Sequence, residues 1–152
     1  MILTKHQAIE GHRKMWNWIA DRLEKATPRD TFDVYDLKQE YEEIHSLNLL
    51  CSCYLCEYAN EKALEEDINS QDRCMYCPLL WEENESNTDF ICEYGNGIEQ
   101  YDDDIIDVIK TFRYEIVEEF GLWNVCDFLA AQRHYDKAAR LARRIANLPE
   151  KR

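Results

Sequence analysis

The sequence predicts a mainly α-helical domain that carries a four-cysteine zinc-binding insert and a short β-hairpin. Two observations predict this class. Apolar residues recur at three- and four-residue steps along several stretches, as they do on amphipathic helices, and five of the seven cysteines lie between residues 51 and 78. A chain of 152 residues fits one compact unit. We therefore expect a single domain over residues 1–152, with the insert at about residues 51–92.

Two helices are predicted before the cysteine-rich region. The first covers about residues 4–26, where Thr4 begins a capping-box pattern and one face is apolar. The second covers about residues 33–45, with Thr31 or Asp33 as its N-cap. Each has one apolar stripe, so each is expected to bury one face in the domain.

The region from the cysteines to residue 101 is predicted to be less regular. Residues 57–67 have a helix-favouring composition and fit one or two helical turns. Residues 82–101 begin as a polar loop. Asn96 and Gly97 then favour a hairpin turn, because both residues adopt positive φ angles at low cost.

Two further helical segments are predicted towards the end of the chain. Residues 103–120 have an apolar face, acids at their start that suit the helix dipole, and a stop signal at Gly121. The last segment covers about residues 123–147, with a break before Asp136 and an end before Pro149. The helices outweigh the irregular part, which is why the class is mainly α.

The cysteines form two matched pairs with the spacing C-x2-C-x17-C-x2-C. They are Cys53, Cys56, Cys74 and Cys77. This spacing is typical of a four-cysteine zinc site, in which each pair directs two thiolates at one tetrahedral ion. Such a site has no open position for water or substrate, so we expect its zinc to be structural.

Other interpretations of the cysteines remain open. An iron–sulfur cluster also uses four thiolates, and free cysteines are common in protein cores. A redox-active pair is less favoured, because no βαβ pattern surrounds either pair. Four residues are candidate substitutes in the ligand set: Cys51, Cys92, Cys126 and His45. Cys92 is the most plausible of these, and Cys126 is expected in the core.

The charge is concentrated in the middle of the chain. Residues 39–132 hold nineteen more acids than bases, whereas the two ends together hold six more bases than acids, and the net charge is −13. Such a surface repels phosphate backbones and anionic membranes and attracts basic proteins. We expect a partner protein with a basic or nucleic-acid-binding surface, and no direct binding to nucleic acid or membrane.

Two charged sets are candidates for binding. The acidic set could imitate the charge density of a nucleic-acid strand, although acids at a helix start also stabilise the helix; it comprises Asp102, Asp103, Asp104, Asp107, Glu115, Glu118 and Glu119. The basic stripe could bind phosphates or pair with the acidic middle of the same chain; it comprises Arg133, Lys137, Arg140 and Arg144.

Motifs of common enzymes are absent. The chain has no His-Glu-x-x-His, no Gly-x-Ser-x-Gly and no glycine-rich phosphate loop. The His-x-Glu segment of zinc deaminases is missing too. His6 and His12 fit solvent or core positions of the first helix better than catalytic positions. We therefore expect no enzymatic activity.

Four short segments, "HRKMWNWIA", "CYLCEYA", "CMYCPLLW" and "RRIANLP", resemble a loose group of small proteins encoded by phages and prophages of Gram-positive bacteria. The resemblance implies a viral origin, the four paired cysteines as metal ligands and a further cysteine at Cys92. It implies no established activity. Because the chain has neither a secretory signal nor a run of eighteen apolar residues, we expect it in the cytoplasm of the host cell.

Three functions follow as hypotheses. The first is a zinc protein that inhibits a host protein through its acidic surface, for example a CRISPR nuclease or another component of antiviral defence. The second is a sponge that sequesters a nucleotide second messenger on the basic stripe. The third is a zinc-module regulator that binds nucleic acid, with an affinity that falls steeply with salt.

Overall fold

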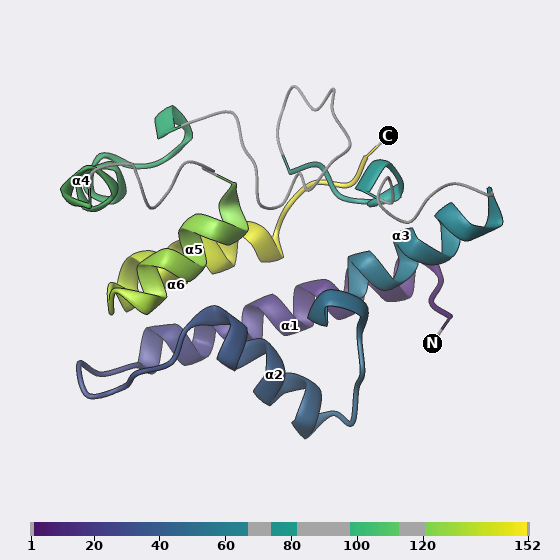
Figure 1. The fold of residues 1–152 in the computed structure, drawn as a ribbon, viewed down its shortest axis with the longest axis horizontal. Helices are drawn as coiled ribbons and strands as arrows, with labels where there is room; N and C mark the ends of the chain where they lie inside the picture. Colours follow the sequence, from purple (N-terminus) through teal and green to yellow (C-terminus); the bar gives the residue numbers. More distant parts are fainter. Residues whose placement is uncertain (1, 67–73, 82–97, 113–120, 152) are drawn as a thin grey trace.

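The computed structural model describes residues 2–66, 74–81, 98–112 and 121–151. These parts of the chain are mainly helical, as predicted (Figure 1). The α-helices are α1 (Lys5–Lys25), α2 (Val34–Ile44), α3 (Tyr54–Glu65), α4 (Asp103–Thr111), α5 (Leu122–Ala131) and α6 (Tyr135–Ala146). The short 3-10 helices η1 (Leu50–Ser52) and η3 (Ile98–Gln100) lie between them, and residues 74–76 form a further 3-10 turn.

Local sequence signals explain where the first two helices begin. The Thr4 side chain accepts from the Gln7 N–H at 3.1 Å, and Gln7 Oε1 accepts from the Thr4 N–H at 2.9 Å, which completes the predicted capping box. Of the two candidate N-caps for α2, Asp33 is the one used. Its side chain accepts from the Asp36 N–H at 2.8 Å.

The predicted break in the C-terminal helical segment is confirmed. It separates α5 from α6 at residues 132–134, where Arg133 has a positive φ of 64°. The prediction of a helix over residues 103–120 is confirmed as far as α4, and residues 113–120 lie outside the described part of the chain. Most of the predicted hairpin, residues 82–97, also lies outside it.

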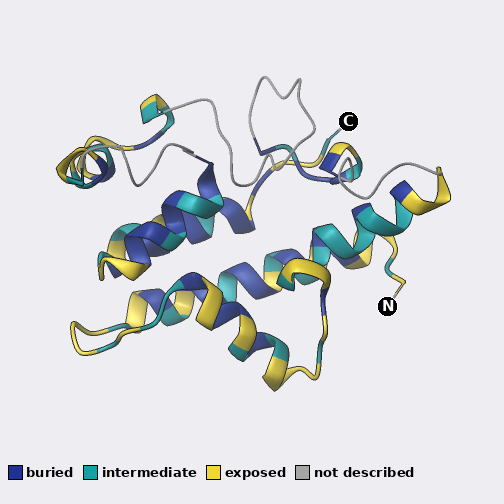
Figure 2. Ribbon diagram, in the orientation of Figure 1, coloured by how far each residue is buried: buried dark blue, intermediate teal, exposed yellow. Residues whose placement is uncertain are grey.

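The core lies mainly between α1, α5 and α6. α6 packs against both α1 and α5, and Figure 2 shows buried residues along all three helices. Met15, Trp16 and Ile19 of α1 are almost fully buried, and so are Leu129 of α5 and Ile145 of α6. Burying an aliphatic or aromatic side chain of this size contributes about 1.5–3 kcal/mol. The packing of these three helices therefore forms the framework that carries the cysteine-bearing segments.

The segment with the second cysteine pair is tied to the C-terminus. Leu79 forms an isolated antiparallel bridge with Glu150. The Leu80 N–H donates to Pro149 O at 2.8 Å, and the Lys151 N–H donates to Pro78 O at 2.9 Å. Within the described ranges, no other β pairing is found.

None of the helices that the structure describes combines the length and the apolar character needed to cross a bilayer.

Candidate metal centre and charged surfaces

The first cysteine pair lies at the start of α3. Cys53 is the N-cap residue of this helix, and a strained turn precedes it, in which Cys51 and Ser52 have φ angles of 53° and 50°. The Cys56 thiol donates to the Cys53 sulfur, which also accepts from the backbone N–H groups of Cys56 and Leu55. These hydrogen bonds lower the pKa of Cys53 to about 6. The position therefore favours a thiolate.

The second cysteine pair lies in a tight turn. The Cys77 N–H donates to Cys74 O at 3.0 Å, and both residues are buried. Burial raises the pKa of Cys77 to about 12, and negative charge on Cys53 also raises it. Hydrogen bonds from the Leu79 N–H and the Trp81 side chain act in the opposite direction and lower it. Charge on Cys53 thus acts on Cys77, although the two residues are far apart in the sequence.

The donor set suits thiolate ligands. Hydrogen bonds from N–H groups to the sulfurs of Cys53 and Cys77 are the kind of outer-shell contact that holds metal-bound thiolates in place. Across residues 2–66, 74–81, 98–112 and 121–151, no group of three or more His, Cys, Asp or Glu side chains is arranged to hold a metal ion. The zinc assignment therefore continues to rest on the spacing of the cysteines and on these contacts.

The candidate substitute ligands are placed differently from one another. Cys51 is exposed, and His45 is the C-cap of α2, with its ring tilted against that of Tyr41. Cys126 is fully buried and its thiol donates to Ala138 O at 3.3 Å, which confirms the prediction of a core residue. Cys92 lies outside the described residues.

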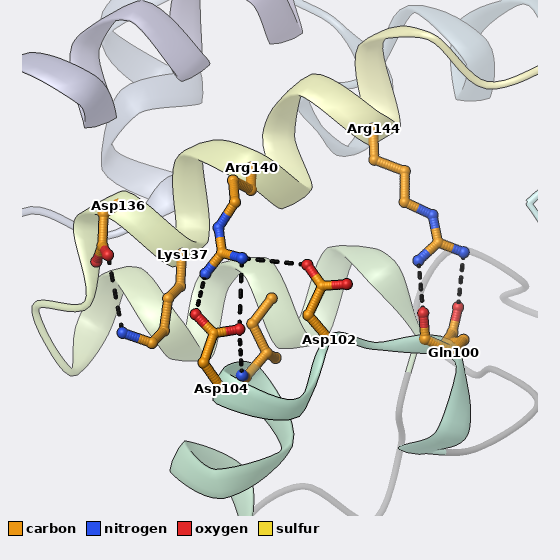
Figure 3. Close-up of polar contacts among 8 residues, drawn as sticks. Gln100, Asp102, Asp104, Asp136, Lys137, Arg140 and Arg144 are labelled. Atoms are coloured by element: carbon orange, nitrogen blue, oxygen red, sulfur yellow. Dashed lines mark hydrogen bonds and ion pairs between the residues drawn. The ribbon is translucent and has the colours of Figure 1, made fainter.

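The acidic set is partly engaged by the basic stripe of the same chain. Arg140 donates from Nη1 to Asp102 Oδ2 at 3.1 Å and to Asp104 Oδ1 at 3.3 Å, and its Nη2 pairs with Asp104 Oδ2 (Figure 3). The hydrogen bond from Arg140 lowers the pKa of Asp104. Asp103 and Asp107 are exposed on α4. Glu115, Glu118 and Glu119 lie outside the described residues.

The rest of the basic stripe also bonds within the chain. Arg144 donates to the backbone and side-chain oxygens of Gln100, both at 3.2 Å. Lys137 lies 3.8 Å from Asp136, and Arg133 donates to Pro28 O at 3.5 Å. Figure 3 shows the side chains of Arg140 and Arg144 directed towards α4 and the segment before it. Pairing with the acidic middle of the chain, one of the two interpretations of this stripe, is therefore observed for Arg140, whereas Arg144 bonds to the neutral Gln100.

Sequence reasoning missed one buried cation, Lys38. It is 2% exposed and its ammonium group lies between the rings of Trp16 and Trp123. The signal was present in the sequence, because Lys38 is four residues after Val34 and three before Tyr41, on the apolar side of α2.

Comparison with known proteins adds no relationship: no family model, no curated protein and no solved structure matches this chain.

Proposed function

We propose that this chain is a non-catalytic zinc protein of phage origin that binds and inhibits a host protein with a basic or nucleic-acid-binding surface, such as a CRISPR nuclease. The observation that carries the proposal is the charge of −13, concentrated in the middle of the chain. A field of this sign speeds encounter with basic surfaces and repels nucleic acid.

The exposed acids of α4 are the best-placed contact residues for such a partner. Asp103 and Asp107 are four residues apart in a helix, so they lie on the same face. Among the described ion pairs, Arg140 pairs with Asp102 and Asp104, but it does not pair with Asp103 or Asp107. Their carboxylates therefore remain available to a basic surface.

A structural zinc ion would have a specific task in this protein. Binding energy at a closed thiolate site becomes folding energy. In this proposal Cys53, Cys56, Cys74 and Cys77 hold the ion, and Cys92 is the substitute. The ion stabilises the insert and does no chemistry on a substrate.

The contacts of the basic stripe weaken the two alternatives. A nucleotide sponge and a nucleic-acid regulator both need free cations for phosphates. Arg140 and Arg144 already bond to acids, amide and carbonyl groups of their own chain. A phosphate would have to displace these partners, so the inhibitor is the function that we favour.

Charge reversal on α4 tests the proposal. Tagged wild-type protein is used to capture its partner from nuclease-treated lysate of the bacterial host, and the affinity for the purified partner is then measured at low and high salt. We expect Asp103→Lys with Asp107→Lys to weaken binding at least tenfold at low salt, because each exposed acid adds to the steering field. The captured protein should also lose its activity when bound.

The control is Asp136→Lys, which reverses an exposed acid on α6, outside the acidic middle. It should leave the affinity near that of wild type. Equal affinity of the Asp103/Asp107 variant and wild type, or a captured protein whose activity is unchanged by binding, would contradict the proposal.

A further inference from the structure

A cavity of about 500 Å³ lies along one face of α1. Its lining residues on this helix recur at steps of three and four between His6 and Asp21, and the segment after α6 adds Glu150. A volume of this size is typical of sites that bind small molecules. Trp18 and Ile9 give the cavity an apolar part, and its other lining side chains are charged or polar.

Most of the charges in this cavity are already paired within the chain. Lys14 Nζ lies 3.0 Å from one carboxylate oxygen of Glu10, and His6 Nε2 lies 3.3 Å from the other. The carboxylate of Asp21 pairs with Arg143 of α6. These groups therefore need no ligand to balance their charge.

Two charges of opposite sign are left over, on Arg13 and Glu150. None of the ion pairs among the described residues includes either of them, so they do not pair with each other. Their backbones are held in place, because Arg13 lies within α1 and Glu150 forms the β bridge with Leu79. The cavity therefore offers one cation and one anion, in separate positions, to a molecule that binds there.

Arg13 also has a hydrogen-bond donor that the described residues do not use. Its Nη2 donates to Leu148 O at 3.2 Å, which anchors the guanidinium group. Its Nε is buried and has no hydrogen-bond partner in the described part of the chain. A buried donor without an acceptor costs free energy. A carboxylate is the acceptor that fits a guanidinium group best, because it takes two parallel hydrogen bonds.

The indole of Trp18 offers a fixed apolar surface in the same cavity. Its ring packs edge-on against Tyr41, with the ring centres 5.4 Å apart, and the guanidinium carbon of Arg22 lies 5.3 Å from the Trp18 ring centre. Ile9, which is buried, lies in the same lining. An aliphatic or aromatic group that packed on these two residues would be removed from water.

We propose that this cavity binds a small zwitterion with an apolar side chain, the class to which free aromatic and branched-chain amino acids belong. The carboxylate of the ligand accepts from Arg13, its ammonium group pairs with Glu150, and its side chain packs on Trp18. A simple anion or cation would match only one of the two unpaired charges. The inference goes beyond the proposed function and depends neither on the zinc site nor on the partner of α4.

Analogues that lack one charge test the inference on the wild-type protein. Binding of L-phenylalanine, L-tryptophan and L-leucine is measured by calorimetry. The amino acid that binds most tightly is then compared with its N-acetyl derivative, which lacks the ammonium group, and its amide, which lacks the carboxylate. We expect each derivative to bind at least tenfold more weakly, because each loses a charge-assisted hydrogen bond. No binding of any of the three amino acids at millimolar concentration, or equal affinity for the derivatives, would overturn the inference.

Two variants assign the charges to their residues. Glu150→Gln should weaken binding of the amino acid at least tenfold but leave the affinity for the N-acetyl derivative unchanged, because that compound has no ammonium group. Arg13→Met should weaken binding of the amino acid but not of the amide. The control is Asp136→Asn, which changes an exposed acid in the lining of a different cavity and should affect neither compound.

The pattern across compounds decides the outcome. If Glu150→Gln has no effect, or weakens the amino acid and its N-acetyl derivative equally, the inference is wrong. Should Arg13→Met fail to fold, the comparison of wild type with Glu150→Gln still decides, because the amide probes the carboxylate site without any change in the protein.

Discussion

His12 shows how burial sets the charge of a single residue. It is 1% exposed, and its Nε2 makes a 2.9 Å hydrogen bond with Ile145 O. Among the described residues, Nδ1 has no hydrogen-bond partner. Burial lowers the pKa of His12 from 6.5 to about 3, so the ring is neutral at physiological pH and donates from Nε2.

This neutral histidine predicts a loss of stability in mild acid. The unfolded chain takes up a proton below pH 6.5, whereas the folded protein does so only near pH 3. The free energy of unfolding should therefore fall as the pH drops through this window, by about 2–3 kcal/mol between pH 7 and pH 4.5. His12→Gln keeps a donor for Ile145 O without titrating, so its stability should depend less on pH when unfolding is measured with urea.

The control for this prediction is His6→Gln, because His6 is exposed and its side chain is 87% accessible. Its stability should follow the wild-type pH dependence. Parallel curves for wild type and His12→Gln would show that the burial of His12 is not the source of the acid sensitivity.

At the scale of elements, Gly11 explains how closely α1 and α3 approach. A Cβ atom at this position would stand 2.5 Å from ring carbons of Tyr54. The Cγ atom of the same ring, at the base of the side chain, would lie at 2.8 Å. The position therefore needs glycine in spite of its low helix propensity.

Gly11→Ala is accordingly expected to destabilise the protein by about 1–2 kcal/mol, because overpacking outweighs the helix propensity that alanine adds. In a Tyr54→Ala background the ring is gone, and the same substitution should stabilise by up to about 1 kcal/mol. Chemical denaturation of the four proteins of this cycle measures both effects. An effect of the same sign in both backgrounds would contradict the contact.

The pairing of Arg140 with α4 gives a second prediction for an element. Arg140 links α6 to Asp102 and Asp104 at the N-terminal end of α4. We expect Arg140→Met to lower the free energy of local opening of α4 by about 1 kcal/mol, the upper range for exposed pairs. Amide hydrogen exchange in α4 should become faster, whereas Arg133→Met should not affect it. Unchanged exchange in Arg140→Met would mean that the apolar face alone holds α4.

The sequence predicts features that depend on contacts between residues close in the chain better than features that depend on contacts between distant segments. Thr4 and Asp33 act within one turn, so the starts of α1 and α2 could be predicted. The apolar stripe of α1 also predicted that a histidine could lie in the core. The apolar side of α2 could have predicted that Lys38 is buried, but its placement between Trp16 and Trp123 depends on three segments that meet only in the folded protein. The ion pairs of Arg140 are of the same kind.

At the scale of the whole molecule, the two cysteine pairs belong to different parts of the framework. The first pair is on the segment that starts α3, which packs against α1 at Gly11. The second is on the segment that Leu79 and its neighbours tie to the chain after α6. An ion shared by both pairs would therefore connect α3 with the C-terminal segment.

Loss of the ion should accordingly affect the stability of the entire fold. We expect Cys53→Ser and Cys77→Ser to reduce bound zinc, measured by elemental analysis, from about one per chain to none, and to lower the free energy of unfolding by several kcal/mol, because metal binding contributes to folding. A strong chelator should lower the Tm of wild type but not of these variants. Cys51→Ser changes an exposed thiol two residues before Cys53 and should keep both the zinc and the Tm; zinc lost in this variant and kept in Cys53→Ser would assign the ligand to Cys51 instead.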